Sequence, residues 1–201
     1  MLPWMARLLH SSMLSDFRMR AIPDALAPFL QPGWRVLDVG CGNQRLARLL
    51  QERVAAEFEG VDVYVPDGTL PFPLKRYDGR TIPHPDRSFD ASLLCDVLHH
   101  ADDPAALLRE TARVSRRLVI LKDHHFEGPV DRLKLKAMDW IGNRGYGVSL
   151  PYGYKTKDQW RALFRELGLE VAGWVDAIRL YPGLVGAVLP PRLHFACALR
   201  V

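Results

Sequence analysis

The chain of 201 residues is long enough for one domain with a full hydrophobic core. Apolar residues make up 48% and charged residues 25% of it, and the basic residues behind the net charge of +4 are scattered, which argues against a nucleic-acid-binding face. Three isolated cysteines argue against a disulfide framework, and no apolar run is long enough for a membrane span. We therefore expect a cytoplasmic protein without stable membrane insertion.

The first half of the chain predicts a helical segment over residues 1–30, followed by alternating strands and turns. Pro23 is expected to break the helix in this segment, and the turn Gln31-Pro32-Gly33 ends it. Prolines and glycines replace the usual helix after the second strand, so a loop is expected there. In order, the predicted elements are a helix over 14–30, a strand Arg35–Val39, a helix Gln44–Arg53, a strand Glu57–Val63 and a strand Leu74–Tyr77.

The second half continues the alternation of strands and helices. Asp103 and Pro104 are typical of a helix start, and Thr156 with Gln159 predicts a capping box. A doubly wound, mostly parallel α/β sheet in a single domain over 1–201 follows from this order, with the last two strands pairing antiparallel. The elements are a strand Phe89–Asp96, a helix through Val114, a strand Leu118–Lys122, a helix Lys157–Leu167 and strands Leu169–Val175 and Leu193–Val201.

The stretch VLDVGCGNQRLARLL reads as a buried strand, a glycine turn and a helix start. Such a turn presents backbone N–H groups to a ligand, and Asp38, two residues before Gly40, adds a carboxylate beside Gly42. Arg45 stands where the nicotinamide fingerprint G-x-G-x-x-G has its third glycine, which disfavours a dinucleotide. S-adenosylmethionine fits better, because it carries an ammonium and a sulfonium and no phosphate.

Acidic residues recur where predicted strands end. Asp62 lies 20 residues after Gly42, about the spacing at which an acid meets ribose hydroxyls in such folds. Because the carboxyl ends of parallel strands share one edge, we expect a rim of carboxylates, some of which cap loops and do not touch a ligand. The rim comprises Asp38, Asp62, Asp78, Asp96 and Asp123.

Together with three further stretches, VLDVGCGNQRLARLL resembles class I S-adenosylmethionine-dependent methyltransferases that act on small molecules (methyltransferase type 11-like). The resemblance covers roughly residues 20–125. The three further stretches are FEGVDV, RYDGRTIPHPDRSFDASLLCDVLHHADDP and LLRETARVSRRLVILKDH. The resemblance implies a seven-stranded Rossmann-like fold and S-adenosylmethionine as cofactor. Two departures stand out, since Gln44 replaces the third glycine of D-x-G-x-G-x-G and the helix after strand two is absent.

The resemblance also implies residue roles. Its cofactor-binding positions are Asp38, Gly40 and Gly42 for the methionine end, Asp62 for the ribose, Val63 and the loop to residue 68 for the adenine wall, Asp78 and Gly79 for the adenine, and Asp96 and Val97 for the sulfonium side.

Methyl transfer from a sulfonium is an in-line displacement, for which alignment supplies much of the rate. An oxygen acceptor also needs a base, and histidine suits because it titrates near neutrality. Candidates are His124, which follows Asp123, and the pair His99 and His100. We expect no metal, because adjacent histidines rarely ligate one ion and regular ligand spacings are absent.

Residues 126–155 lose periodicity, and the stretch from Trp140 to Trp160 is rich in aromatics and glycines. We interpret residues 126–155 as a lid-like insertion over a small, apolar or aromatic acceptor, with a structural plug as the alternative. Two other functions stay open: a catalytically silent S-adenosylmethionine-binding protein or partner subunit, and a nucleic-acid or protein methyltransferase. The latter lacks its N/D-P-P-Y/F signature after strand four. Oligomeric state is not predictable from the sequence.

Overall fold

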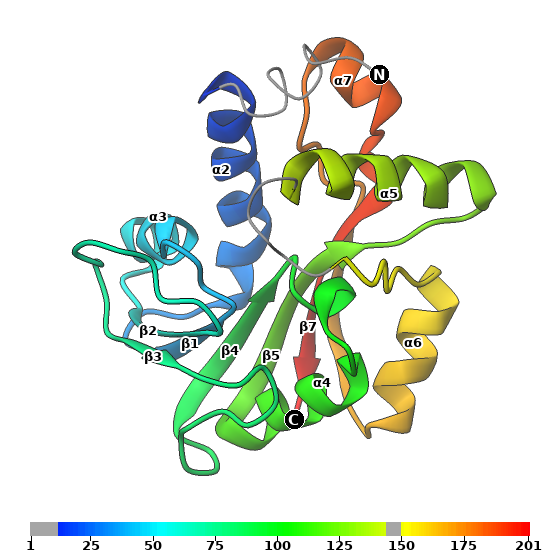
Figure 1. Ribbon diagram of the computed structural model, residues 1–201. Coiled ribbons are helices and arrows are strands. Elements are labelled where there is room, and N and C mark those ends of the chain that lie inside the picture. Colours follow the sequence, from blue (N-terminus) through cyan, green and yellow to red (C-terminus); the bar gives the residue numbers. More distant parts are fainter. Residues whose placement is uncertain (1–11, 144–149) are drawn as a thin grey trace.

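The computed structural model describes residues 12–143 and 150–201. One seven-stranded sheet forms its centre, in the order β3-β2-β1-β4-β5-β7-β6 (Figure 1). The first five strands are parallel, and β7 runs antiparallel to both β5 and β6, as predicted. The strands are β1 (Arg35–Val39), β2 (Glu57–Asp62), β3 (Leu74–Arg76), β4 (Phe89–Cys95), β5 (Ser115–His124), β6 (Glu170–Asp176) and β7 (His194–Arg200).

Helices cover both faces of the sheet. Side chains alternate along the strands, so Leu93 joins the core under α2 and α3, and Leu94 joins the core under α4 and α6. None of the helices in the described ranges is long and apolar enough to cross a membrane. The helices are α2 (Ser12–Leu26), α3 (Arg45–Val54), α4 (Pro104–Val114), α5 (Pro129–Asn143), α6 (Lys157–Glu166) and α7 (Gly183–Val188), with 3₁₀ turns η1 (Ala27–Phe29), η2 (Leu98–His100) and η3 (Pro191–Leu193).

Sequence signals at helix starts are confirmed. Asp103 accepts a hydrogen bond from the amide of Ala106 at 2.9 Å, and Thr156 and Gln159 form the reciprocal capping box. The predicted break at Pro23 is wrong, because α2 continues through this residue. A proline inside a helix removes one backbone donor, and here the burial of Ile22 and Leu26 against the sheet outweighs that loss.

The expectation that residues 126–155 lack regular structure is also wrong, since α5 occupies Pro129–Asn143. Two acids interrupt the apolar inner side of α5, where Asp131 and Asp139 lie buried beside Leu135, and several other apolar residues of the helix are exposed. A search for an apolar inner face therefore finds no helical period. Tyr146 of the aromatic stretch lies outside the described residues.

The loop predicted after β2 is confirmed, because residues 63–73 contain no helix. Gln44 fastens this loop to the glycine turn. Its Oε1 accepts a hydrogen bond from the amide of Phe72 at 3.0 Å, and its Nε2 donates to the carbonyl of Pro73 at 3.4 Å. Gln44 also has a φ of 60°, so the third-glycine position keeps a left-handed backbone although a larger side chain occupies it.

Candidate functional site

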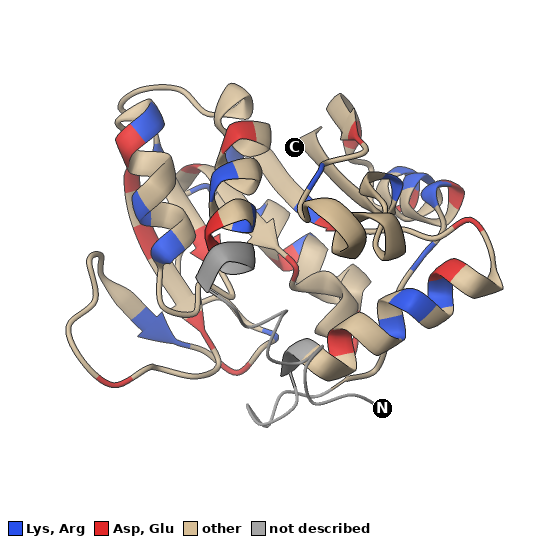
Figure 2. Cartoon of the chain, turned by 90° about the horizontal axis from the view of Figure 1, so that it is seen from above, with Lys and Arg blue, Asp and Glu red and all other residues tan. Residues whose placement is uncertain are grey.

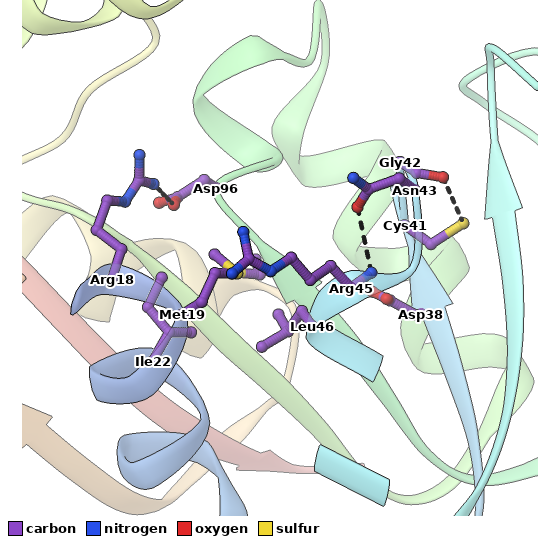
Figure 3. A pocket seen from close by; sticks show the side chains of 12 residues that line it. Arg18, Met19, Ile22, Asp38, Cys41, Gly42, Asn43, Arg45, Leu46 and Asp96 are labelled. Atoms are coloured by element: carbon purple, nitrogen blue, oxygen red, sulfur yellow. Dashed lines mark hydrogen bonds and ion pairs between the residues drawn. The ribbon is translucent and has the colours of Figure 1, made fainter. Parts of the chain in front are cut away.

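Two hollows open at the carboxyl ends of the parallel strands and share Gly40. The first, of about 330 Å³, lies between α2 and the glycine turn (Figure 3). The second, of about 560 Å³, lies beyond the turn and beside the start of α4. The charged and polar residues that line the first hollow include Arg18, Asp38, Asn43, Arg45 and Asp96. The residues that line the second hollow include Asp62, Val63, Asp78, Gly79, Val97 and His100. The structure thus brings the predicted cofactor-binding residues to one edge.

The glycine turn differs from the expectation of free amides. The Gly40 amide donates to the carbonyl of Val61 at 2.8 Å, and the Gly42 amide donates to the Asp62 carboxylate at 2.7 Å. These amides are therefore engaged within the chain. Gly40 has a φ of 72°, and an added Cβ would lie 2.7 Å from Val97 Cγ2. The turn therefore allows close packing of the backbone at Gly40, while the amides of Gly40 and Gly42 are already paired.

Asp38 is a buried carboxylate that makes no hydrogen bond or ion pair with another residue of the described ranges, and it lines the first hollow. Burial raises its pKa to about 7, and the charge of Asp62 adds to this rise. A buried acid without a partner is costly unless a ligand supplies a counter-charge. The hollow therefore fits a cationic group.

Asp62 and Asp78 organise their own loops. Asp62 accepts hydrogen bonds from the amides of Gly42 and Tyr64, the latter at 3.0 Å. Asp78 accepts from the amides of Arg80 and Thr81, and these bonds lower its pKa. A carboxylate has about four acceptor sites, so each acid keeps capacity for a ligand hydroxyl or amino group.

Asp96 anchors a set of ion pairs that spacing along the sequence could not reveal. Arg18 from α2 lies 3.2 Å from its carboxylate, and the fully buried Lys122 of β5 pairs with the other oxygen. Burial alone would raise the pKa of Asp96, but Lys122 and Arg18 outweigh it and hold the pKa below its usual range. Figure 3 shows Arg18 reaching from α2 across the first hollow. Arg18 and Lys122 are absent from the residues predicted above.

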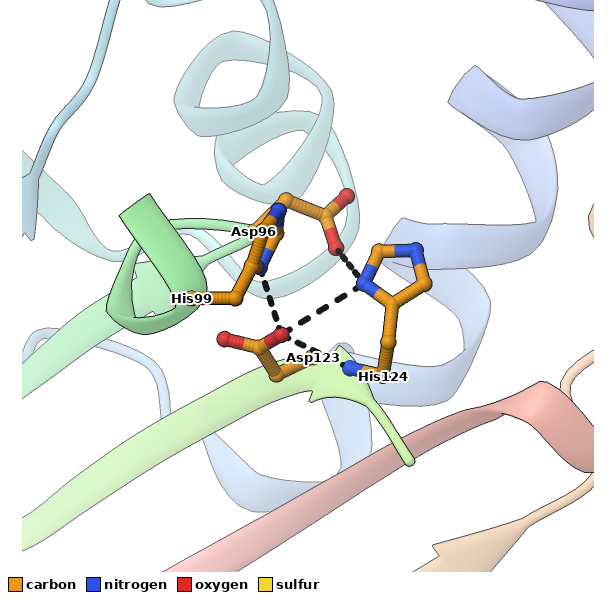
Figure 4. Close-up of side chains that lie close together, drawn as sticks. All are labelled: Asp96, His99, Asp123 and His124. Carbon is orange, nitrogen blue, oxygen red and sulfur yellow. Dashed lines mark hydrogen bonds and ion pairs between the residues drawn. The ribbon is translucent and has the colours of Figure 1, made fainter. Parts of the chain in front are cut away.

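Behind Asp96, two of the predicted histidines meet Asp123 (Figure 4). His99 Nδ1 lies 2.7 Å from Asp123 Oδ1; burial would lower the pKa of His99, but this acid raises it. His124 Nδ1 lies 3.3 Å from Asp96 Oδ1 and 3.4 Å from Asp123 Oδ1. Burial and Lys122 keep the pKa of His124 well below its usual value. His124 is therefore neutral near pH 7, with Nδ1 directed at carboxylates.

His100 points to a different partner. Its ring lines the second hollow, and its Nε2 lies 3.5 Å from Asp139 of α5. The Tyr154 hydroxyl donates to the same acid at 2.8 Å, and the Tyr154 ring lies 5.3 Å from the His99 ring. Tyr154 and Asp139 therefore connect the predicted lid segment to the histidines, whereas Trp160 belongs to the core.

The expectation of no metal rested on the spacing of ligand residues along the sequence, but in the fold the parallel strands β4 and β5 end side by side. Asp96, His99, Asp123 and His124 each offer a ligand atom, all within 4.8 Å of one another. Lys122, however, already supplies a cation to Asp96, and the histidine Nδ1 atoms face carboxylates as hydrogen-bond donors. As assembled, the cluster is a hydrogen-bonded network.

A family model described as a methyltransferase domain matches residues 13–172, a range that includes both hollows and every predicted site residue. The chain belongs to the S-adenosylmethionine-dependent methyltransferases. This family identifies S-adenosylmethionine as the cofactor and confirms the resemblance drawn from the sequence.

Known relatives are distant in sequence. The 27-O-demethylrifamycin SV methyltransferase of Amycolatopsis mediterranei (strain S699) is 26% identical over 162 residues, covering 70% of this chain and 56% of the relative. The chain thus matches little more than half of that relative's length.

Two solved structures share the fold of this methyltransferase. A Haloferax volcanii complex between the Trm112 methyltransferase activator and a methyltransferase has a TM-score of 0.72 at 18% identity, covering 96% of this chain and 92% of that chain. A SAM-dependent methyltransferase from Aquifex aeolicus has a TM-score of 0.65 at 17% identity, covering 100% and 99%. At these identities the likeness shows the fold alone.

Proposed function

We propose that this methyltransferase transfers the methyl group of S-adenosylmethionine to a small, apolar or aromatic acceptor, with His124 as the base. The observation that carries the proposal is the position of the neutral His124. Its Nδ1 lies 3.3 Å from the carboxylate of Asp96, a residue that lines the first hollow. The predicted cofactor residues support the same donor orientation, with the methionine end at Asp38 and the adenosine end near Asp62 and Asp78.

The donor supplies a methyl group already activated on a positively charged sulfur. The protein then has to align the acceptor and exclude water. In this proposal Asp38 pairs with the donor ammonium, and Arg18 pairs with its carboxylate. Asp96 lines the first hollow, and Arg18 and Lys122 already neutralise its charge. Asp96 therefore does not form a strong ion pair with the sulfonium.

His124 would remove the acceptor proton. Its Nδ1 faces Asp96 and Asp123, so this nitrogen carries the hydrogen and Nε2 has the free lone pair. Nε2 makes no hydrogen bond within the described ranges of the chain. The acceptor hydroxyl proton passes to Nε2 as the acceptor oxygen bonds to the methyl carbon and the carbon–sulfur bond breaks. His99 and His100 then act as positioning residues through Asp123 and Asp139.

Aromatic side chains support the acceptor class. Tyr154 of the proposed lid-like segment 126–155 lies beside the histidines, with ring centroids 5.3 Å from His99 and 6.1 Å from His124, and the Tyr152 ring lies 6.4 Å from that of Tyr154. The name of the Amycolatopsis relative specifies an O-methylated small molecule, which is in line with this class.

The direct test combines calorimetric titration with S-adenosylmethionine and a radiolabelled methyl-transfer assay on phenols, quinols, lipids and polyketides. We expect heat of binding, and turnover on at least one acceptor that His124→Gln lowers by about 10²–10⁴-fold. Donor binding without turnover on any acceptor would favour the silent-binding or partner-subunit alternative, and label on protein or nucleic acid would favour a macromolecular acceptor. Absence of donor binding would contradict the whole proposal.

A further inference from the structure

The outward face of α5 is apolar. Val130, Leu133 and Trp140 are 65%, 68% and 44% exposed. Successive residues in an α-helix are about 100° apart, so these three side chains form one stripe along the helix. The opposite side carries Asp131 and Asp139, which are both 5% exposed. Buried Leu135 lies between these two acids, so the inner side of α5 is mixed, whereas a helix on the surface of a globular protein usually turns its apolar residues inward.

Contacts on the inner side fix this orientation. Arg192 forms a bidentate ion pair with Asp131, and Tyr154 donates a hydrogen bond to Asp139. Turning the apolar stripe inward would expose Leu135, which is fully buried, and break both of these interactions. The exposed apolar stripe is therefore imposed by the packing of α5.

Basic residues flank the stripe on both sides. By the same helical geometry Arg132 and Lys136 lie on one flank and Lys134 on the other. Within the described part of the chain none of the three forms an ion pair, and Arg132 and Lys136 lie over the rings of Phe126 and Tyr152. Figure 2 shows these cations as blue bands along α5. Long basic side chains of this kind keep their stems on apolar surface and extend their charges outward.

Helix α7 adds to the same end of the molecule (Figure 1). Its sequence GLVGAV has no charge, and Leu184 and Val188 are 87% and 50% exposed. The segments on either side of α7 contact α5, because the Tyr181 hydroxyl lies 3.6 Å from Met138 Sδ and Arg192 of η3 pairs with Asp131. The apolar residues of both helices and the three cations together form what we call the α5–α7 face.

We propose that the α5–α7 face docks reversibly on an anionic lipid bilayer. Apolar side chains ringed by cations match an apolar interior beneath negatively charged headgroups. A second copy of the chain would bring the same positive charges to the contact and repel them, which disfavours a dimer through this face. The docking is peripheral and independent of the acceptor proposed above.

Sedimentation of the full chain with vesicles tests this inference. We expect binding to phosphatidylcholine vesicles that contain phosphatidylglycerol, weaker binding to pure phosphatidylcholine, and release at high salt. Leu133→Glu should weaken binding about tenfold or more, because it places a charge in the stripe. The matched control is Val171→Glu, which changes a 39% exposed valine on β6 and should bind as the unchanged protein does. Melting temperature and donor binding of both variants establish that they are folded.

Three outcomes would overturn docking. The first is no sedimentation with either vesicle. The second is equal binding of Leu133→Glu and the unchanged protein, since the stripe would then play no part. The third is a dimer that Leu133→Glu dissociates, without vesicle binding, which would assign the face to a second copy. Loss of donor binding in the unchanged protein would instead count against the proposed function alone.

Discussion

His99 Nδ1 lies 2.7 Å from Asp123 Oδ1, and both side chains are buried. This pair joins the end of β4 to the end of β5 behind the donor hollow. It favours the protonated ring of His99, since the acid raises the pKa of His99 above its usual value of about 6.5 despite burial. The pair therefore makes stability depend on pH.

The pH dependence has a definite sign. A histidine with a raised pKa contributes stability that is complete below about pH 6.5 and is lost as pH rises through the folded pKa. We expect the melting temperature of the unchanged protein to fall relative to His99→Gln between pH 6.5 and 9. A change of about 1 kcal/mol corresponds to roughly 2–4 °C for a chain of this size. Parallel melting curves for the two proteins across this range would refute the ion pair.

Asp38→Asn should stabilise the free protein and prevent donor binding. Because burial raises the pKa of Asp38 to about 7, its ionisation opposes folding from about pH 4 upward, fully so above 7. The variant removes this cost, so its melting temperature should exceed that of the unchanged protein at pH 8 and converge with it below pH 4. Calorimetry should show donor affinity reduced at least about a hundredfold, as expected for loss of a charged partner. A variant that binds the donor normally would remove Asp38 from the site.

Donor affinity of the unchanged protein should itself rise with pH. In the proposed function the donor ammonium pairs with the ionised Asp38, whose carboxylate is protonated in the free protein below a pKa of about 7. We expect the dissociation constant to fall between pH 6 and 8, with one proton released on binding at the lower pH. Calorimetry in buffers of different ionisation enthalpy measures that proton, and a pH-independent affinity would contradict the assignment.

Asp62→Ala should weaken donor binding by about 1–3 kcal/mol, roughly fivefold to over a hundredfold. The change removes an acceptor for the ribose hydroxyls and the hydrogen bond that holds the Gly42 amide. Asp67→Ala, at an exposed acid in the following loop, is the matched control and should retain normal affinity. Equal affinities of the two variants would show that Asp62 serves neither purpose.

His124→Gln should lower kcat by about 10²–10⁴-fold, the usual contribution of a general base. Donor affinity should change little, because Asp38 and Asp62 remain. His125→Gln provides the control, since its ring stacks on Phe195, with centroids 5.6 Å apart, and, unlike His124, forms no ion pair with Asp96 or Asp123 within the described residues. The assay uses an acceptor that the unchanged protein methylates. If both variants have a similar kcat, His124 is not the base and its role is structural.

The sequence was sufficient for the sheet and for the acidic rim because both follow from local patterns. Strand ends in a parallel sheet share an edge, so Asp62 and Asp96 could be placed together without knowing any contact. The pairing of Arg18 with Asp96 could not be predicted from the sequence, because it depends on how α2 crosses the sheet. Helix α5 was not predicted because acids interrupt its buried side and apolar residues stand on its exposed side, which obscures the pattern on which helix prediction depends. The glycine turn was located correctly, but its engaged amides depend on tertiary contact with β2.

The salt bridge between Arg18 and Asp96 joins residues 78 positions apart. One wall of the first hollow comes from α2, which precedes the whole sheet in the chain. The hollow therefore exists only when α2 has packed against the sheet. Ligand addition should then raise the melting temperature by mass action, and the size of this rise at a fixed concentration reports how completely the helix is seated. Thermal shift with the donor product S-adenosylhomocysteine is thus a measure of native assembly as much as of affinity.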